Sequence, residues 1–278
     1  MFIHLFSGLV LLFGISTDVW ASHFLEPIGT EIPKIAPEGR FFIQSGVRLV
    51  KSDAAATVQN DDIFVPVVLE YGLGHKSQFA FEADMLVQDE AAGRNVPANK
   101  GPNEIAFAFR HLLRGDAEDA GEEHRGAHSE SKYECDCLSG EPLAFELEFA
   151  PSTSKTRGAE VKLMFLRAQN VFKTHHLFLN AGVAFEGEVE NNAHVYTPHV
   201  LYNAAYMVPL NRELLHGAIE LNGKVKPGST GDRAEWILRP QIIWYSPQNS
   251  LAVKLGVAFG ISHDDPERGG SLLVSRLF

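Results

Sequence analysis

The stretch from residue 113 to 141 gathers residue types that bind transition metals. It holds both cysteines of the sequence, Cys135 and Cys137, together with His124 and His128. Two thiolates and two imidazoles could form a tetrahedral zinc-type site. Their spacing matches no recognised zinc motif, so a flexible acidic loop with free or oxidised thiols is the favoured interpretation. A bridge between the two cysteines would close a very small, strained ring. We predict no bound cofactor and keep the metal site open as the alternative.

Catalytic groups are scarce. A serine or threonine nucleophile needs a histidine base within hydrogen-bond reach. No His-x-Ser pair falls on an expected strand, and the nearest candidate is the stretch from Tyr196 to His199. No glycine-rich phosphate loop follows a strand-to-helix change either. We therefore predict that the chain is not an enzyme.

Histidines gather at one set of expected strand ends, which we predict to be periplasmic: His75, His111, His175, His176 and His216. They could capture metal or sense pH at the inner mouth of a barrel. The plainer alternative is that these histidines lie at the hydrated rim of the barrel, at the membrane–water interface, without a specific role.

The elements that position these residues are strands. From Phe41 onward, apolar and polar residues alternate with period two, which puts each set on its own face of a strand. Leu143, Phe145 and Leu147, for example, alternate with Ala144 and Glu146. There are about twelve such segments, each near the roughly ten residues that a tilted strand needs to cross a bilayer. They centre on 41–50, 62–72, 77–87, 102–112, 142–150, 158–168, 175–186, 196–209, 215–226, 235–246, 250–260 and 269–278.

The pattern predicts an all-β fold, a closed antiparallel up-and-down transmembrane β-barrel of about twelve strands over residues 41–278. Residues 1–21 are expected to be a signal peptide, with its apolar run from Leu9 to Ile15 and cleavage after Ala21; a buried N-terminal helix is the alternative. Residues 22–40 hold three prolines and predict an extended periplasmic lead. Short connections after the second, sixth, eighth and tenth strands indicate periplasmic turns, and strand counting puts the insertion 113–141 in the periplasm.

Full charges occupy the polar face of the expected strands, as a water-filled lumen would accept. The predicted pore-lining residues are Arg48, Glu70, Glu82, Asp84, Glu104, Arg110, Glu146, Glu148, Glu160, Lys162, Glu220, Lys224, Lys226, Arg239 and Lys254. Acids concentrate early in the chain and bases late. Because chain order is wall order in a barrel, an acidic wall would face a basic wall and set a field across a pore. The alternative is charge pairing that fills a narrow lumen and only stabilises it.

Bulk properties favour a membrane barrel over other classes. The net charge of −11 argues against a nucleic-acid partner, which would need basic patches. A mean hydropathy of −0.06 is too polar for a bundle of membrane helices but suits strands whose alternate residues meet lipid. Trp236 and Trp244 share one parity and predict two interfacial aromatic girdles about 20 Å apart. The chain ends on Phe278, a terminal aromatic that predicts recognition by the barrel-assembly machinery. Arg276 shares its parity, and its head group would have to reach the interface.

Several strand patterns resemble the outer-membrane transporter family named for the MetA pathway of phenol degradation. The matching stretches are 107–110, 143–148, 220–223, 255–260 with Ser262, Asp264, Asp265 and Pro266, and the final strand 270–278. The resemblance covers roughly residues 41–278 as diffuse patterns. It implies a small barrel with a proposed role in the passage of small organic compounds. The long insertion 113–141 departs from the family, whose members usually have a short link there.

These observations predict a narrow channel or transporter in the bacterial outer membrane, through which small solutes pass without an energy source. Its expected partners are outer-membrane lipid, the assembly machinery and the solute. The alternative is a non-conducting structural or interaction barrel whose periplasmic insertion docks a partner or binds metal.

Overall fold

The chain forms strands almost throughout the part that the structure, a computed structural model, describes. The described residues are 26–52, 60–88, 101–115, 141–152, 157–172, 174–190, 193–211, 214–228, 234–246, 249–262 and 268–278. The strands are β1 (Phe41–Ser52), β2 (Asn60–Gly74), β3 (Ser77–Gln88), β4 (Gly101–Arg114), β5 (Leu143–Ala150), β6 (Arg157–Phe172), β7 (His175–Glu190), β8 (Ala193–Asn211), β9 (Leu215–Val225), β10 (Ala234–Ser246), β11 (Leu251–Gly260) and β12 (Arg268–Leu277). No helix among these residues is long and apolar enough to cross a membrane.

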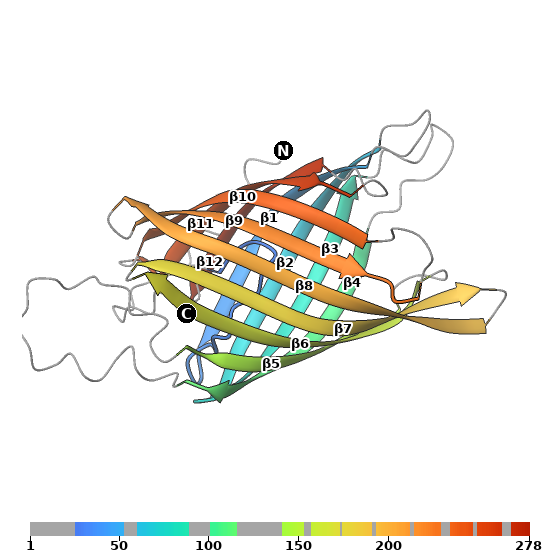
Figure 1. Cartoon of the computed structure of the whole chain (residues 1–278), viewed down its shortest axis with the longest axis horizontal. Helices are drawn as coiled ribbons and strands as arrows, with labels where there is room; N and C mark the ends of the chain where they lie inside the picture. The colour runs from blue at the N-terminus through green and yellow to red at the C-terminus, as the bar shows by residue number, and fades with distance from the viewer. Residues whose placement is uncertain are drawn as a thin grey trace, which may run out of the picture.

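The twelve strands close into one antiparallel barrel, which confirms the predicted fold (Figure 1). Each strand pairs with its neighbours in the chain, and β1 pairs with β12 from Phe42↔Leu277 to Lys51↔Arg268. A closed barrel has no free edge, so its main-chain groups are satisfied within the sheet, as a hydrocarbon environment demands.

The observed strand bounds lie within a few residues of the predicted ones, except at the hairpin of β7 and β8. Strands were expected to end at 186 and restart at 196, but pairing continues to Glu190↔Ala193. An antiparallel hairpin can close over two residues, so the ladder extends through most of the expected loop. We call the end of the barrel where β1 begins and β12 ends the turn end. The short connections after β2, β6, β8 and β10 lie there.

Period-two alternation divides the sheet into an apolar outer face and a mixed inner face. Large apolar side chains such as Phe79, Leu147 and Ile219 are exposed on the outside, while their chain neighbours Ala80 and Glu148 are buried inside. Exposed apolar side chains around a closed sheet are what lipid contact requires. The alternation therefore places apolar side chains on the outside, as in a membrane barrel, whereas a soluble barrel places them inside.

Both predicted girdle tryptophans lie on the outer face. Trp244 is exposed, and Trp236 lies across Gly223 of β9, where an added Cβ would come within 2.5 Å of its ring. An aromatic ring over a strand glycine covers main chain that would otherwise be bare. At the turn end, the guanidinium of Arg276 lies 5.2 Å from the ring centroid of Phe278, a cation–π contact that shields this outward-facing charge.

The residues before β1 run inside the barrel, which differs from the periplasmic lead expected for 22–40. Residues 26–40, hereafter the N-terminal segment, lie within the ring of strands (blue in Figure 1), with Ile32, Ile35 and Ala36 buried. Its prolines favour an extended chain and lack an N–H, so the segment does not extend the sheet. Polar side chains of the inner wall satisfy its main-chain groups instead.

Candidate functional site: the lumen and the N-terminal segment

The predicted pore-lining residues all have inward parity on their strands, with Lys226 directly after β9 ends. The buried ones are Glu70, Arg110, Glu146, Glu148, Glu220 and Lys254. The half-buried ones are Arg48, Glu82, Asp84, Glu104, Glu160, Lys162, Lys224, Lys226 and Arg239. Inward position alone does not make a residue line a pore, because the N-terminal segment occupies part of the lumen.

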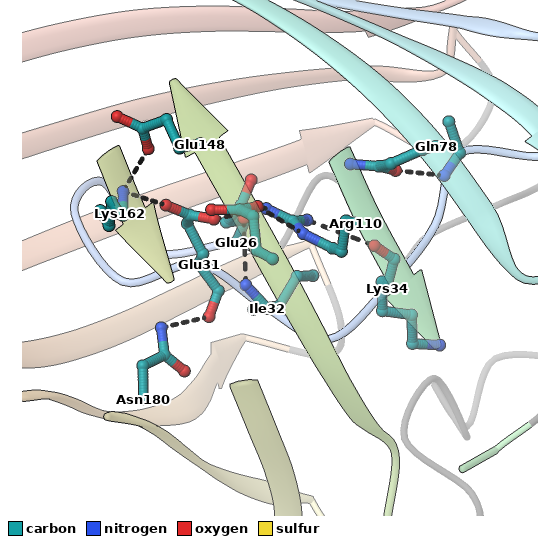
Figure 2. A network of polar contacts seen from close by, with 11 residues as sticks. Glu26, Glu31, Ile32, Lys34, Gln78, Arg110, Glu148, Lys162 and Asn180 are labelled. Atoms are coloured by element: carbon teal, nitrogen blue, oxygen red, sulfur yellow. Dashed lines mark hydrogen bonds and ion pairs between the residues drawn. The ribbon is translucent and has the colours of Figure 1, made fainter. Parts of the chain in front are cut away.

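Glu31 of the N-terminal segment lies at the centre of a charge cluster (Figure 2). Its carboxylate lies 2.6 Å from Nη2 of Arg110 on β4 and 3.3 Å from Nζ of Lys162 on β6. Arg110 also pairs with Glu146 at 2.6 Å, and Lys162 also pairs with Glu148. Burial alone would raise the pKa of Glu31, but Lys162 and Arg110 hold that pKa well below its usual range. Glu31 is therefore a charged anchor of the segment.

Side chains of the inner wall also form hydrogen bonds to the main chain of the N-terminal segment. The N–H groups of Ile28, Gly29 and Ala36 donate to side-chain oxygens of the wall, and the carbonyls of Gly29, Glu31 and Lys34 accept from wall side chains. The wall partners, in segment order, are Gln241, Glu220, Asn222, Asn180, Arg110 and Gln78. These partners come from β3, β4, β7, β9 and β10, so the segment crosses the lumen instead of following one strand.

Apolar side chains of the segment pack against the wall toward the turn end. Ile32 belongs to a buried cluster that includes Phe42, Phe178, Met207 and Ile243 from the wall. A second cluster packs Ile35 against Leu112, Ala144, Met164 and Leu166. Burying side chains of this size contributes roughly 1.5–3 kcal/mol each, so the two isoleucines also help to hold the segment.

The segment enters across the end of β2, where Gly72 allows a close approach. Gly39 donates its N–H to the carbonyl of Gly72 at 3.0 Å, and Gly72 donates to Arg40 at 3.2 Å. A Cβ on Gly72 would overlap the carbonyl oxygens of Ala36 and Pro37. At Gly74, a residue of the same strand, an added Cβ would meet nothing within 4 Å.

Half-buried Glu26 and fully buried Lys254 interact through their charges and form a second charge group. Lys254 is 0% exposed, and its ammonium has no hydrogen-bond partner among the described residues; the charges of Glu26, Glu70 and Glu220 act on it. Burial, followed by the charge of Glu70, raises the pKa of Glu26 to about 7, against the opposing charges of Arg110 and Lys254. Glu26 also accepts the N–H of Ile32 at 3.1 Å, which folds the segment back on itself.

Charges of the wall pair locally and do not form two opposed walls. Ion pairs join Arg48 to Asp84, Lys224 to Glu186 and, at 3.2 Å, Arg239 to Glu220. Each pair joins strands that are close in the barrel. With the pairs around Glu31, this arrangement supports the alternative interpretation, in which charge pairing stabilises a filled lumen.

The candidate catalytic and metal residues are not assembled into a site in the described part of the chain. His199 of the stretch 196–199 lies 3.5 Å from Glu186, while Tyr196 faces outward. The carboxylates of Glu31, Glu146 and Glu148 lie within 4.8 Å of one another, but Arg110 and Lys162 already stand among them. His124, His128, Cys135 and Cys137 lie outside the described residues.

The histidines of the turn end divide between the two faces. His176 and His216 are buried on the inner face, whereas His111 packs between Phe109 and Phe145 on the outer face. The Nδ1 atom of His111 lies 2.9 Å from Oγ of Ser77, its partner on β3. Because Ser77 and His111 lie on two adjacent strands, no pattern within a single strand could indicate this pair.

A closed twelve-stranded barrel with an apolar exterior and a charged interior is a transmembrane β-barrel of the kind found in bacterial outer membranes. No family model and no curated protein matches the chain. The likeness to solved structures is confined to barrel architecture. The translocator domain of the autotransporter NalP from Neisseria meningitidis has a TM-score of 0.47 and 12% identity, covering 85% of this chain and 87% of that one. OmpF of Salmonella typhi, in complex with daunomycin, has a TM-score of 0.38 and 7% identity, covering 86% and 97%. A loop-deletion form of OmpT, an outer-membrane protein of Vibrio cholerae, has a TM-score of 0.29 and 10% identity, covering 86% and 98%.

Proposed function

We propose that the protein is a narrow channel of the bacterial outer membrane for passive passage of small molecules, and that the N-terminal segment closes it. The observation that carries the proposal is the filling of the lumen by a segment of the chain that is not part of the sheet. The barrel closes through β1 and β12 without this segment. A channel with a separable occlusion can open while its wall stays intact.

The contacts of the segment suit a reversible closure. Apart from an isolated bridge between Glu38 and Gly72, it is held by side chains and not by a strand ladder. Individual hydrogen bonds contribute only about 0.5–1.5 kcal/mol net, because water replaces them on release. The polar inner wall would be hydrated once the segment leaves, and hydration lowers the cost of opening.

A structural barrel that never conducts is the second candidate. Local ion pairing and the buried side chains of Ile32 and Ile35 favour it, since both stabilise a filled lumen. Docking by the insertion 113–141, recognition of Phe278 by the assembly machinery and membership of the MetA-pathway family stay predictions.

The two candidates differ in conductance, and two glycines of β2 provide a matched pair of variants. Gly72→Val adds bulk where the segment crosses the rim, whereas Gly74→Val adds it in open space. In planar bilayers we expect wild type and Gly74→Val to show low, intermittent conductance, and Gly72→Val a larger and steadier one. If the correctly folded Gly72→Val barrel shows no conductance, the channel proposal fails and the structural one stands.

A further inference from the structure

Three wall residues converge on Glu31 and recognise two of its chemical groups at once (Figure 2). Arg110 and Lys162 bind the side-chain carboxylate at 2.6 and 3.3 Å. Asn180 of β7 donates its Nδ2 to the main-chain carbonyl of the same residue at 2.9 Å. A carboxylate and an amide carbonyl separated as in a glutamyl residue therefore fit this part of the wall.

Glu31 is the shared carboxylate partner of the two cations of this site. The side chain of Arg110 is 4% exposed and that of Glu146 is 2% exposed, so both act in a medium of low dielectric. Arg110 pairs with Glu31 and Glu146, and Lys162 pairs with Glu31 and Glu148. Each cation therefore has one carboxylate partner in the wall and one in the segment. When Glu31 leaves, both cations lose one partner, and a carboxylate of a guest can take its place.

The wall next to this site is suited to peptide main chain. Gln241 and Glu220 accept the N–H groups of Ile28 and Gly29, and Asn222 donates to the carbonyl of Gly29. These contacts do not depend on the side chains of the residues that they hold. A guest that continues as an extended peptide on the N-terminal side of its glutamate can form all of them.

We propose that the lumen contains a binding site for an extended acidic peptide, in which Arg110, Lys162 and Asn180 recognise one glutamyl residue and Glu31 is the built-in competitor. The inference rests on the proposed function, since the N-terminal segment must leave before a second peptide can bind. Once the segment has left, an acidic peptide can occupy the site in its place and prevent the segment from returning.

The test uses the full-length chain carrying Glu31→Gln, which weakens the built-in competitor. The probe is a fluorescein-labelled peptide with the sequence of residues 26–37, and its partner peptide has glutamine in place of the glutamate that corresponds to Glu31. Fluorescence anisotropy in detergent should show at least about tenfold tighter binding of the glutamate peptide, because charge-assisted hydrogen bonds to arginine and lysine are lost in the other. Equal affinity for the two peptides, or binding of neither, would overturn the inference.

Asn180 and its partner across the sheet, Asn203, provide a wall control. Asn180→Ala should weaken binding of both peptides by a similar factor, because it removes the contact to the main chain. Asn203→Ala should leave both affinities unchanged, since none of the segment's hydrogen bonds among the described residues uses Asn203. Loss of affinity in Asn203→Ala as large as in Asn180→Ala would contradict the assigned contact.

The outcomes separate this inference from the channel proposal. If conductance rises in Gly72→Val but no selective peptide binding is found, the channel proposal stands and the acidic-peptide site is refuted. If the peptide binds selectively but Gly72→Val does not conduct, the channel proposal is refuted and the acidic-peptide site stands.

Discussion

Ile219 and Glu220 are neighbours in β9 with opposite surroundings. Ile219 is 58% exposed on the outer face, while Glu220 is 0% exposed and accepts hydrogen bonds from Gly29, Arg239 and Gln241. A lipid-facing position penalises any charge, whereas the inner position depends on one particular charge. Glu220→Arg would be expected to be mild if the lumen were simply wet. The contacts of Glu220 make it costly, because the substitution would leave Arg239 facing another cation.

Substitution of Ile219 tests the assignment of faces. Ile219→Arg near the middle of β9 should lower the free energy of unfolding by about 2–4 kcal/mol in lipid vesicles, because the guanidinium would face hydrocarbon. Leu214→Arg, in the turn before β9, should cost at most about 1 kcal/mol at the interface. Urea-induced unfolding followed by tryptophan fluorescence gives both values. Similar costs at the two positions would mean that the apolar face of β9 does not meet lipid.

At the scale of the elements, the strands follow directly from the sequence because their signal is local. A strand residue reports its face through its immediate neighbours, so the alternation of Leu143, Ala144, Phe145 and Glu146 suffices to assign β5. Strand number and the short turns follow in the same way. The sequence pattern predicts a shorter hairpin of β7 and β8 than the structure has, because the residues at its end lack strong apolar side chains.

The place of the N-terminal segment could not be derived in this way. Its prolines correctly indicate a chain outside any sheet, but an extended segment fits the periplasm and a lumen equally well. Its partners Gln78, Arg110 and Glu220 come together only when the barrel closes. The one local signal was the pair of acids Glu26 and Glu31 within a proline-rich, apolar stretch. Such acids need partners once the isoleucines beside them are buried.

Docking of the N-terminal segment should depend on pH through Glu26. The pKa of this carboxyl is raised from 4.5 to about 7 in the docked segment, so the docked state holds its proton more tightly than the released state. Docking is therefore strongest below about pH 4.5, weakens as the pH rises toward about 7, and levels off above that value. Glu31 stays ionised over this range, because its pKa lies well below the ordinary value.

Channel openings report this dependence. Open probability of the wild type in planar bilayers should increase between about pH 5 and pH 7. Glu26→Gln keeps an acceptor for the N–H of Ile32 but cannot ionise, so its open probability should be nearly flat over the same range. A pH response of Glu26→Gln as steep as that of wild type would assign the titration to another group.

At the scale of the whole molecule, the barrel and the N-terminal segment have separate tasks. The strands supply an apolar exterior and a closed hydrogen-bonded wall, and neither depends on the segment. The segment neutralises and fills the interior toward the turn end. If the segment moves, the wall keeps the local pairs Arg48–Asp84, Lys224–Glu186 and Arg239–Glu220, which place both signs of charge along the lumen. An open lumen would then have mixed charge and weak selection between small cations and anions.

The position of the N-terminal segment inside the lumen is the central claim, and thiol accessibility tests it most directly. With Cys135 and Cys137 changed to serine, a single cysteine is introduced as Ile32→Cys or Glu38→Cys. Ile32 is 1% exposed inside the barrel, whereas the side chain of Glu38 is 59% exposed at the rim. A water-soluble maleimide applied to the folded barrel should label the cysteine at 38 at least about tenfold faster than the one at 32, because labelling of the buried site requires the segment to open first. Adding Gly72→Val should bring the two rates together, and equal rates in the background without Gly72→Val would contradict a lumen filled by this segment.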